Sequence, residues 1–173
     1  VLSNMDRVSA SPVAVVSDRD EQELQLSAKS LDPVSHPRAR AVARPALFVL
    51  STPRAGSSLL QLCLEASPLL YAPQELYLLP FDTLDERIKG IGRAAGLDGG
   101  LIAAVGNLRG DAGALVASWE ANDVNTRHAY RMLVEWTAPR LFCDKTPGYA
   151  FDSATLSRAE RLMASPRYLS TVR

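Results

Sequence analysis

The sequence has no excess of charge of either sign, because 19 basic and 19 acidic residues give a formal net charge of zero. A surface that binds nucleic acid through bulk charge is therefore not expected. It also lacks any run of about 18 apolar residues and any secretory signal, so we expect no membrane partner and a cytoplasmic location. The remaining composition, 47% hydrophobic and 22% charged over 173 residues, is typical of one ordinary globular domain.

Cysteine and histidine are scarce as well. Cys63 and Cys143 both fall in apolar stretches, so we expect two buried thiols rather than a disulfide or a zinc site. His36 and His128 match no motif. Together the cysteines and histidines supply no metal-binding constellation, and we expect no metal.

The first 44 residues show little periodicity and are rich in Ser, Asp, Arg, Ala and Pro. Apart from one short helix expected at 20–29, we interpret residues 1–44 as a linker or N-terminal extension and residues 45–173 as the N-terminal part of a domain. Because the chain opens on Val1 and ends at Arg173, directly after a predicted strand, we expect it to be part of a larger protein that continues at the C-terminal side.

From residue 45 onward, apolar runs of strand length alternate with segments of helical periodicity. Core strands are predicted at 46–50, 140–144 and 167–173, and a short strand or extended loop at 71–77 beside the first. Helices are predicted at 57–66, 82–95, 101–108, 112–122, 125–138 and 153–164. Continuous apolar strands and a strand–turn–helix unit predict an α/β fold, in which helices flank a parallel sheet of the P-loop type.

The turn between the first strand and the first helix of this unit suits a bound phosphate. A loop at a helix N-terminus presents free backbone N–H groups and the positive end of the helix dipole. Gly56 lets the backbone approach closely, Arg54 adds a positive charge, and the serines at 57 and 58 add hydroxyl donors. On these residues alone, a plain turn with a capping serine remains the alternative.

A Walker A loop, G-x-x-x-x-G-K-S/T, does not fit, because Ser51 and Ser57 stand where the first glycine and the lysine belong. Residues 48–60 instead resemble the 5′-phosphosulfate loop of sulfotransferases that use 3′-phosphoadenosine 5′-phosphosulfate (PAPS), P-R/K-S/T-G-S/T-S/T-L. Ala55 departs from this pattern, since the family usually has a hydroxyl there, but its backbone donor remains. The resemblance implies that the nucleotide and its product PAP contact Thr52, Pro53, Arg54, Ala55, Gly56, Ser57 and Ser58.

Two later segments are similar to the same family. Residues 141–149 resemble its D/E-K-S/T-P-x-Y element, which places Lys145 at the C-terminal end of a parallel strand, where ligands bind. A solvated surface lysine is the alternative. Residues 165–173 resemble the strand that leads into the 3′-phosphate-binding arginine, which implies that Arg173 is this arginine and that the sulfotransferase fold is truncated at its C-terminal side.

For the acceptor side, the resemblance implies that Glu75 removes the proton of an acceptor hydroxyl, as a glutamate does in several branches of the family. Lys145 and Arg54 would stabilise charge on the sulfuryl and leaving oxygens during in-line transfer. A structural or solvated glutamate is the alternative reading, and other branches use a histidine, which here could lie beyond residue 173.

Residues 72–87 resemble the sulfotransferase domains of modular polyketide and olefin synthases. This resemblance implies as acceptor the β-hydroxyl of an acyl chain on an acyl carrier protein, with neighbouring synthase domains as partners. The alternatives are a sulfotransferase for a sugar, lipid or small alcohol, a P-loop nucleotide kinase, and a nucleotide-binding domain without turnover.

Overall fold

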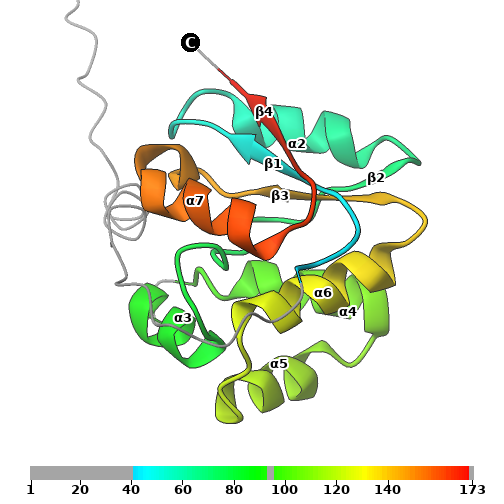
Figure 1. The fold of residues 1–173 in the computed structure, drawn as a ribbon. Helices are drawn as coiled ribbons and strands as arrows, with labels where there is room; N and C mark the ends of the chain where they lie inside the picture. The colour runs from blue at the N-terminus through cyan, green and yellow to red at the C-terminus, as the bar shows by residue number, and fades with distance from the viewer. Residues whose placement is uncertain (1–40, 93–95, 172–173) are drawn as a thin grey trace, which may run out of the picture.

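The computed structural model describes residues 41–92 and 96–171 (Figure 1). The helix expected at 20–29, His36 and Arg173 lie outside these residues. Val42 already packs against the domain: it is 3% exposed, forms a bridge with Met163, and donates its N–H to the Leu162 carbonyl at 2.8 Å. Contact with the domain therefore begins within the stretch predicted as a linker or extension.

A parallel sheet forms the centre of the structure, with the strand order β2-β3-β1-β4 among the described residues. The strands are β1 (Ala46–Leu50), β2 (Leu70–Tyr71), β3 (Leu141–Lys145) and β4 (Pro166–Ser170). The parallel α/β fold is confirmed. The prediction that residues 71–77 lie beside the first strand is wrong, because β3 lies between β1 and β2.

The helices are α2 (Ser57–Glu65), α3 (Leu84–Ile91), α4 (Gly99–Arg109), α5 (Ala112–Ala121), α6 (Thr126–Thr137) and α7 (Ser153–Leu162), with a 3₁₀ turn η2 (Tyr149–Phe151). At the starts of α3, α6 and α7, the side chains of Thr83, Asn125 and Asp152 accept backbone N–H groups. The helices predicted between residues 57 and 164 are confirmed apart from their ends. Helix α3 stops at Ile91, short of the predicted residue 95, because Gly92 adopts φ 68° and cannot continue the helix.

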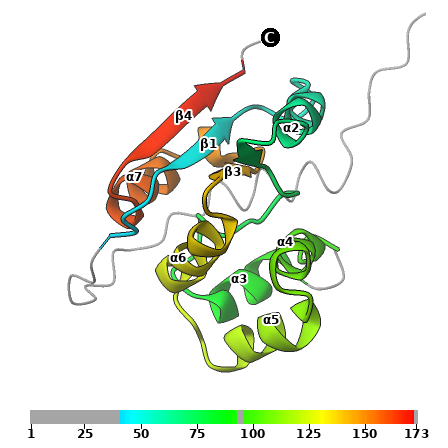
Figure 2. The ribbon, with the colours of Figure 1, turned by 90° about the vertical axis from the view of Figure 1, so that its right-hand side faces the viewer.

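Helix α2 lies on one face of the sheet and α7 on the other (Figure 2). Side chains of β1 and β3 alternate between two apolar layers. Phe48 and Phe142 face the main core, which α4, α6 and α7 complete. Val49 and Cys143 face the other way and pack beneath Leu60 of α2. Both central strands are therefore buried on both faces, as the continuous apolar runs predict.

Helix α2 covers the sheet with only one side. Ser57 and Gln61 face the sheet, whereas Leu59, Leu62 and Cys63 are exposed, so the prediction of a buried Cys63 is wrong. An apolar stretch in a helix places some of its residues on the outer face whenever one side alone finds a partner. The other cysteine, at 143, is buried as predicted, and burial raises the pKa of its thiol to about 12.

Strand β4 is an edge strand rather than a core strand, and this prediction is wrong. Its residues from Arg167 to Ser170 are exposed, with Tyr168 at 40%, and β1 is its one strand neighbour in the described ranges.

Every helix in the described ranges is too short or too polar to cross a bilayer.

Replacing Phe48 tests the packing of the sheet. Its ring is fully buried and meets Tyr130 edge-on at 6.1 Å between centroids. We expect Phe48→Ala to lower the free energy of unfolding by about 3–5 kcal/mol. The matched change Phe151→Ala removes a ring that is 45% exposed and should have a clearly smaller effect. Denaturant unfolding measures both, and equal losses would contradict this description of the core.

Candidate functional site

The loop between β1 and α2 turns at the carboxyl edge of the sheet. Its backbone is tightly wound: the Ala55 N–H donates to the Thr52 carbonyl at 3.2 Å, and both Arg54 (φ 65°) and Gly56 (φ 80°) are left-handed. Left-handed backbone suits glycine but is strained for arginine, and such strain persists only where the surroundings impose it. The side chains of Thr52, Arg54 and Ser58 are exposed, whereas Ser57 is buried.

The start of α2 has the features of an anion site. No side chain caps it, and its first turn contains no acidic residue. Ser51 Oγ and Thr171 Oγ1 are buried without a hydrogen-bond partner. Leu50 and Ser170 are paired at the ends of β1 and β4, and these two hydroxyls belong to the residues that directly follow them. Unpaired buried donors beside a helix N-terminus fit the phosphate groups of a nucleotide.

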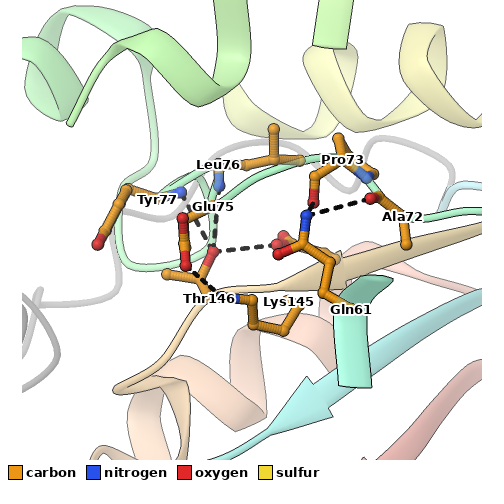
Figure 3. Close-up of polar contacts among 9 residues, drawn as sticks. Gln61, Ala72, Pro73, Glu75, Leu76, Tyr77, Lys145 and Thr146 are labelled. Carbon is orange, nitrogen blue, oxygen red and sulfur yellow. Dashed lines mark hydrogen bonds and ion pairs between the residues drawn. The ribbon is translucent and has the colours of Figure 1, made fainter. Parts of the chain in front are cut away.

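Lys145 is the last residue of β3 and lies opposite Val49. Its side chain is fully buried and forms an ion pair with Glu75, whose side chain is 18% exposed (Figure 3). The structure therefore brings the two predicted catalytic residues together across 70 positions of sequence. The alternative of a solvated lysine is excluded by this burial.

The backbone around Glu75 is held from two sides. Gln61, on the inner face of α2, donates to the carbonyls of Ala72 (3.3 Å) and Pro73 (2.8 Å). On the other side, Gly100 of α4 lies so close that a Cβ there would be 1.9 Å from the Glu75 carbonyl oxygen. Glycine is required at this position because the two backbones touch.

A buried carboxylate precedes the lysine. Asp144 is fully buried and accepts hydrogen bonds from the hydroxyls of Tyr130 (2.5 Å), Thr146 (3.1 Å) and Tyr149 (3.2 Å). Burial raises the pKa of Asp144 to about 6, against the opposing effect of these three hydroxyl bonds. Burial likewise raises the pKa of the Tyr130 and Tyr149 phenols. Asp144 and Lys145 face opposite sides of the sheet because consecutive strand residues alternate.

Several of these residues were not identified as functional from the sequence. Thr146 and Tyr149 are part of the motif that contains Lys145, and their place in it was the available signal. Tyr130 and Gln61 lie in helices without any motif, and their contacts depend on tertiary packing.

The segment that follows Lys145 also contacts the loop between β1 and α2. The Gly148 N–H donates to the Ser51 carbonyl at 3.3 Å, so the chain after β3 reaches the start of the loop. By contrast, His128 contacts Arg131 and the Trp119 ring on α6 and α5, and none of the site residues. Within the described ranges, no group of three or more His, Cys, Asp and Glu side chains gathers as a metal site would need.

Comparisons with protein-family models gave no match. A comparison with curated proteins likewise gave none. Among solved structures, the sulfotransferase domain of the Synechococcus PCC 7002 olefin synthase matches at 32% identity with a TM-score of 0.76, over 81% of this chain and 52% of that one. The sulfotransferase domain of the curacin biosynthetic pathway matches at 35% identity with a TM-score of 0.65, over 74% of this chain and 47% of that one.

The chain thus spans about half the length of the solved domains that it matches. Both matches share the fold of this chain, and their sequence identities of 32% and 35% add a similarity in sequence to the similarity in fold. By fold and by sequence, the chain is related to the sulfotransferase domains of the olefin synthase and of the curacin pathway.

Proposed function

We propose that this protein transfers a sulfuryl group from PAPS to a hydroxyl, namely the β-hydroxyl of an acyl chain on an acyl carrier protein. One observation carries the proposal: the Glu75–Lys145 pair and the uncapped loop before α2 lie at the same edge of the sheet, in a chain related to sulfotransferase domains. The acyl carrier protein and neighbouring synthase domains are proposed as partners because one related domain is from an olefin synthase and the other is from the curacin biosynthetic pathway.

The loop of residues 52–58 would hold the 5′-phosphosulfate. Its backbone N–H groups and the Ser57 and Ser58 hydroxyls donate to oxygen, and Arg54 supplies positive charge. By the family resemblance, Arg173 would bind the 3′-phosphate. PAPS, when bound, supplies the sulfuryl group, and the loop orients that group towards the acceptor.

Glu75 would accept the hydroxyl proton on its carboxylate. It is the more exposed member of the ion pair, at 18% against 0% for Lys145, and so the member that an acceptor can reach. Proton transfer to Glu75 removes the negative charge that faces the Lys145 ammonium. Lys145 is then able to stabilise the charge that develops on the transferred and leaving oxygens.

Nucleotide titration separates this function from that of a P-loop kinase. We expect the full-length protein to bind PAP in calorimetric titration without Mg²⁺ and to bind ATP with Mg²⁺ far more weakly. Arg54→Ala should weaken PAP binding by about tenfold, the loss of one charge-assisted contact. The control Arg161→Ala removes an exposed arginine from α7, on the opposite face of the sheet from α2, and should leave the affinity unchanged. Preference for ATP would favour the kinase.

Glu75→Gln tests the proposed base. We expect it to lower kcat with a 3-hydroxyacyl carrier protein by about 10²- to 10⁴-fold, because glutamine cannot take the proton. PAP affinity should stay within a few-fold of the parent. Glu65→Gln, at the exposed end of α2, is the matched control. Turnover near the parent level would remove Glu75 as the base and point to a histidine beyond residue 173. An equally active sugar, lipid or small alcohol would exclude the carrier-bound acceptor.

Gly100→Ala tests whether the place of Glu75 matters. The new Cβ would overlap the Glu75 carbonyl, so the backbone must shift, and we expect kcat to fall by about 10- to 100-fold. Gly99→Ala adds the same methyl group one residue earlier, where nothing lies within 4 Å, and should keep the parent kcat. Steady-state kinetics of both variants are compared, and equal values for the two would contradict the role of the close contact.

A further inference from the structure

The backbone that follows Glu75 is held by side chains instead of by a strand or helix. Residues 76–79 belong to no regular element, yet each of their N–H groups has a side-chain hydroxyl as acceptor. Thr146 serves the first half of this segment and Tyr149 the second (Figure 3 shows the Thr146 half). The bonds run from Leu76 N and Tyr77 N to Thr146 Oγ1, at 3.2 and 3.4 Å, and from Leu78 N and Leu79 N to the Tyr149 hydroxyl, at 3.1 and 3.3 Å.

This pattern determines where the two hydroxyl protons point. A hydroxyl has two acceptor lone pairs and one proton, and both lone pairs of Thr146 and of Tyr149 are engaged by backbone N–H groups. Each hydroxyl can therefore offer only its proton to Asp144, which accepts the one on Oδ1 and the other on Oδ2. An asparagine at 144 would lose one of the two links in either orientation, since its NH₂ group cannot accept.

The first and last carbonyls of the same segment are held as well. Arg87 Nε donates to the Leu76 carbonyl and Arg158 Nε to the Leu79 carbonyl, both at 2.9 Å, and both arginines are buried. Between them Tyr77 adopts φ 50°, a left-handed conformation that a side chain other than glycine adopts only under constraint. The segment is thus held from both ends in one conformation.

We propose that Asp144 is a positioning residue for the reaction: by accepting the protons of Thr146 and Tyr149, it fixes residues 76–79 and so sets the Glu75 carboxylate against Lys145. This role rests on the proposed function. Asp144 is fully buried on the face of the sheet opposite Lys145, so it acts through the two hydroxyls and the backbone that they hold.

Thr146→Val is the direct test, because valine keeps the branched shape and removes only the hydroxyl. We expect kcat to fall by about 10- to 100-fold, as for a small misplacement of the base, whereas the Kd for PAP stays within a few-fold. Thr146→Ser restores the hydroxyl and should recover most of the parent kcat. Hydrogen exchange at the amides of residues 76–79 should quicken in the valine variant and not in the serine variant.

A double-variant cycle shows whether Thr146 acts through Glu75. In a Glu75→Gln background, Thr146→Val should cause little further loss of kcat, because the group that it positions is already inactive. Full additivity of the two losses would overturn the proposal, as would an equal loss in the valine and serine variants or a parent-like kcat for Thr146→Val. If Thr146→Val does not fold, Tyr149→Phe removes the other hydroxyl and takes its place in the same cycle.

The parent protein separates the two proposals. If the parent neither binds PAP nor transfers a sulfuryl group, the proposed function fails and the positioning role falls with it. If the parent is active and the cycle is additive, the positioning role alone is overturned.

Discussion

Strand β3 ends in two charged residues that are both fully buried, and this constraint decides where much of the surrounding chain lies. Asp144 and Lys145 point to opposite faces of the sheet, and an uncompensated charge at either place would be strongly destabilising. The compensating groups meet in one stretch of chain. Glu75 pairs with the lysine directly. The N–H groups just after it donate to the two hydroxyls, of Thr146 and Tyr149, that in turn donate to Asp144.

The same constraint explains why the chain leaves the sheet after β2. Strand β2 has only two residues, Leu70 and Tyr71, and the backbone that follows would need ladder partners if it continued. The hydroxyls of Thr146 and Tyr149, which follow β3, and guanidinium groups from α3 and α7 supply the hydrogen bonds that a neighbouring strand would have given. An irregular segment whose N–H groups are all bonded can present Glu75 at the carboxyl edge, where an alternating strand would have placed the side chain over one face of the sheet.

Local patterns in the sequence were sufficient for the strands, most helices and the turn before α2, because each depends on a short run of residues. They were insufficient wherever tertiary contact decides. Cys63 is exposed because α2 covers the sheet with one side only, and β2 pairs with β3 because of the crossover order. Glu75 and Lys145 were identified by motif resemblance, yet their pairing joins residues 70 apart, which no local pattern encodes. The roles of the loop residues remain predictions.

Hydrogen bonds join the loop before α2 to the segment that contains Glu75, and this bears on how the proposed reaction would be favoured. Gln61 lies on α2, directly after this loop, and holds the chain leading to Glu75, and the Gly148 N–H donates to the Ser51 carbonyl at the start of the loop. In the resting state the carboxylate cancels the lysine charge, so the pair adds no net charge beside an anionic donor. In this proposal, the Glu75–Lys145 pair gains a net positive charge only when Glu75 takes the acceptor proton. This is the stage when negative charge grows on the transferred and leaving oxygens. An interaction that strengthens at that stage lowers the barrier without holding the ground state more tightly.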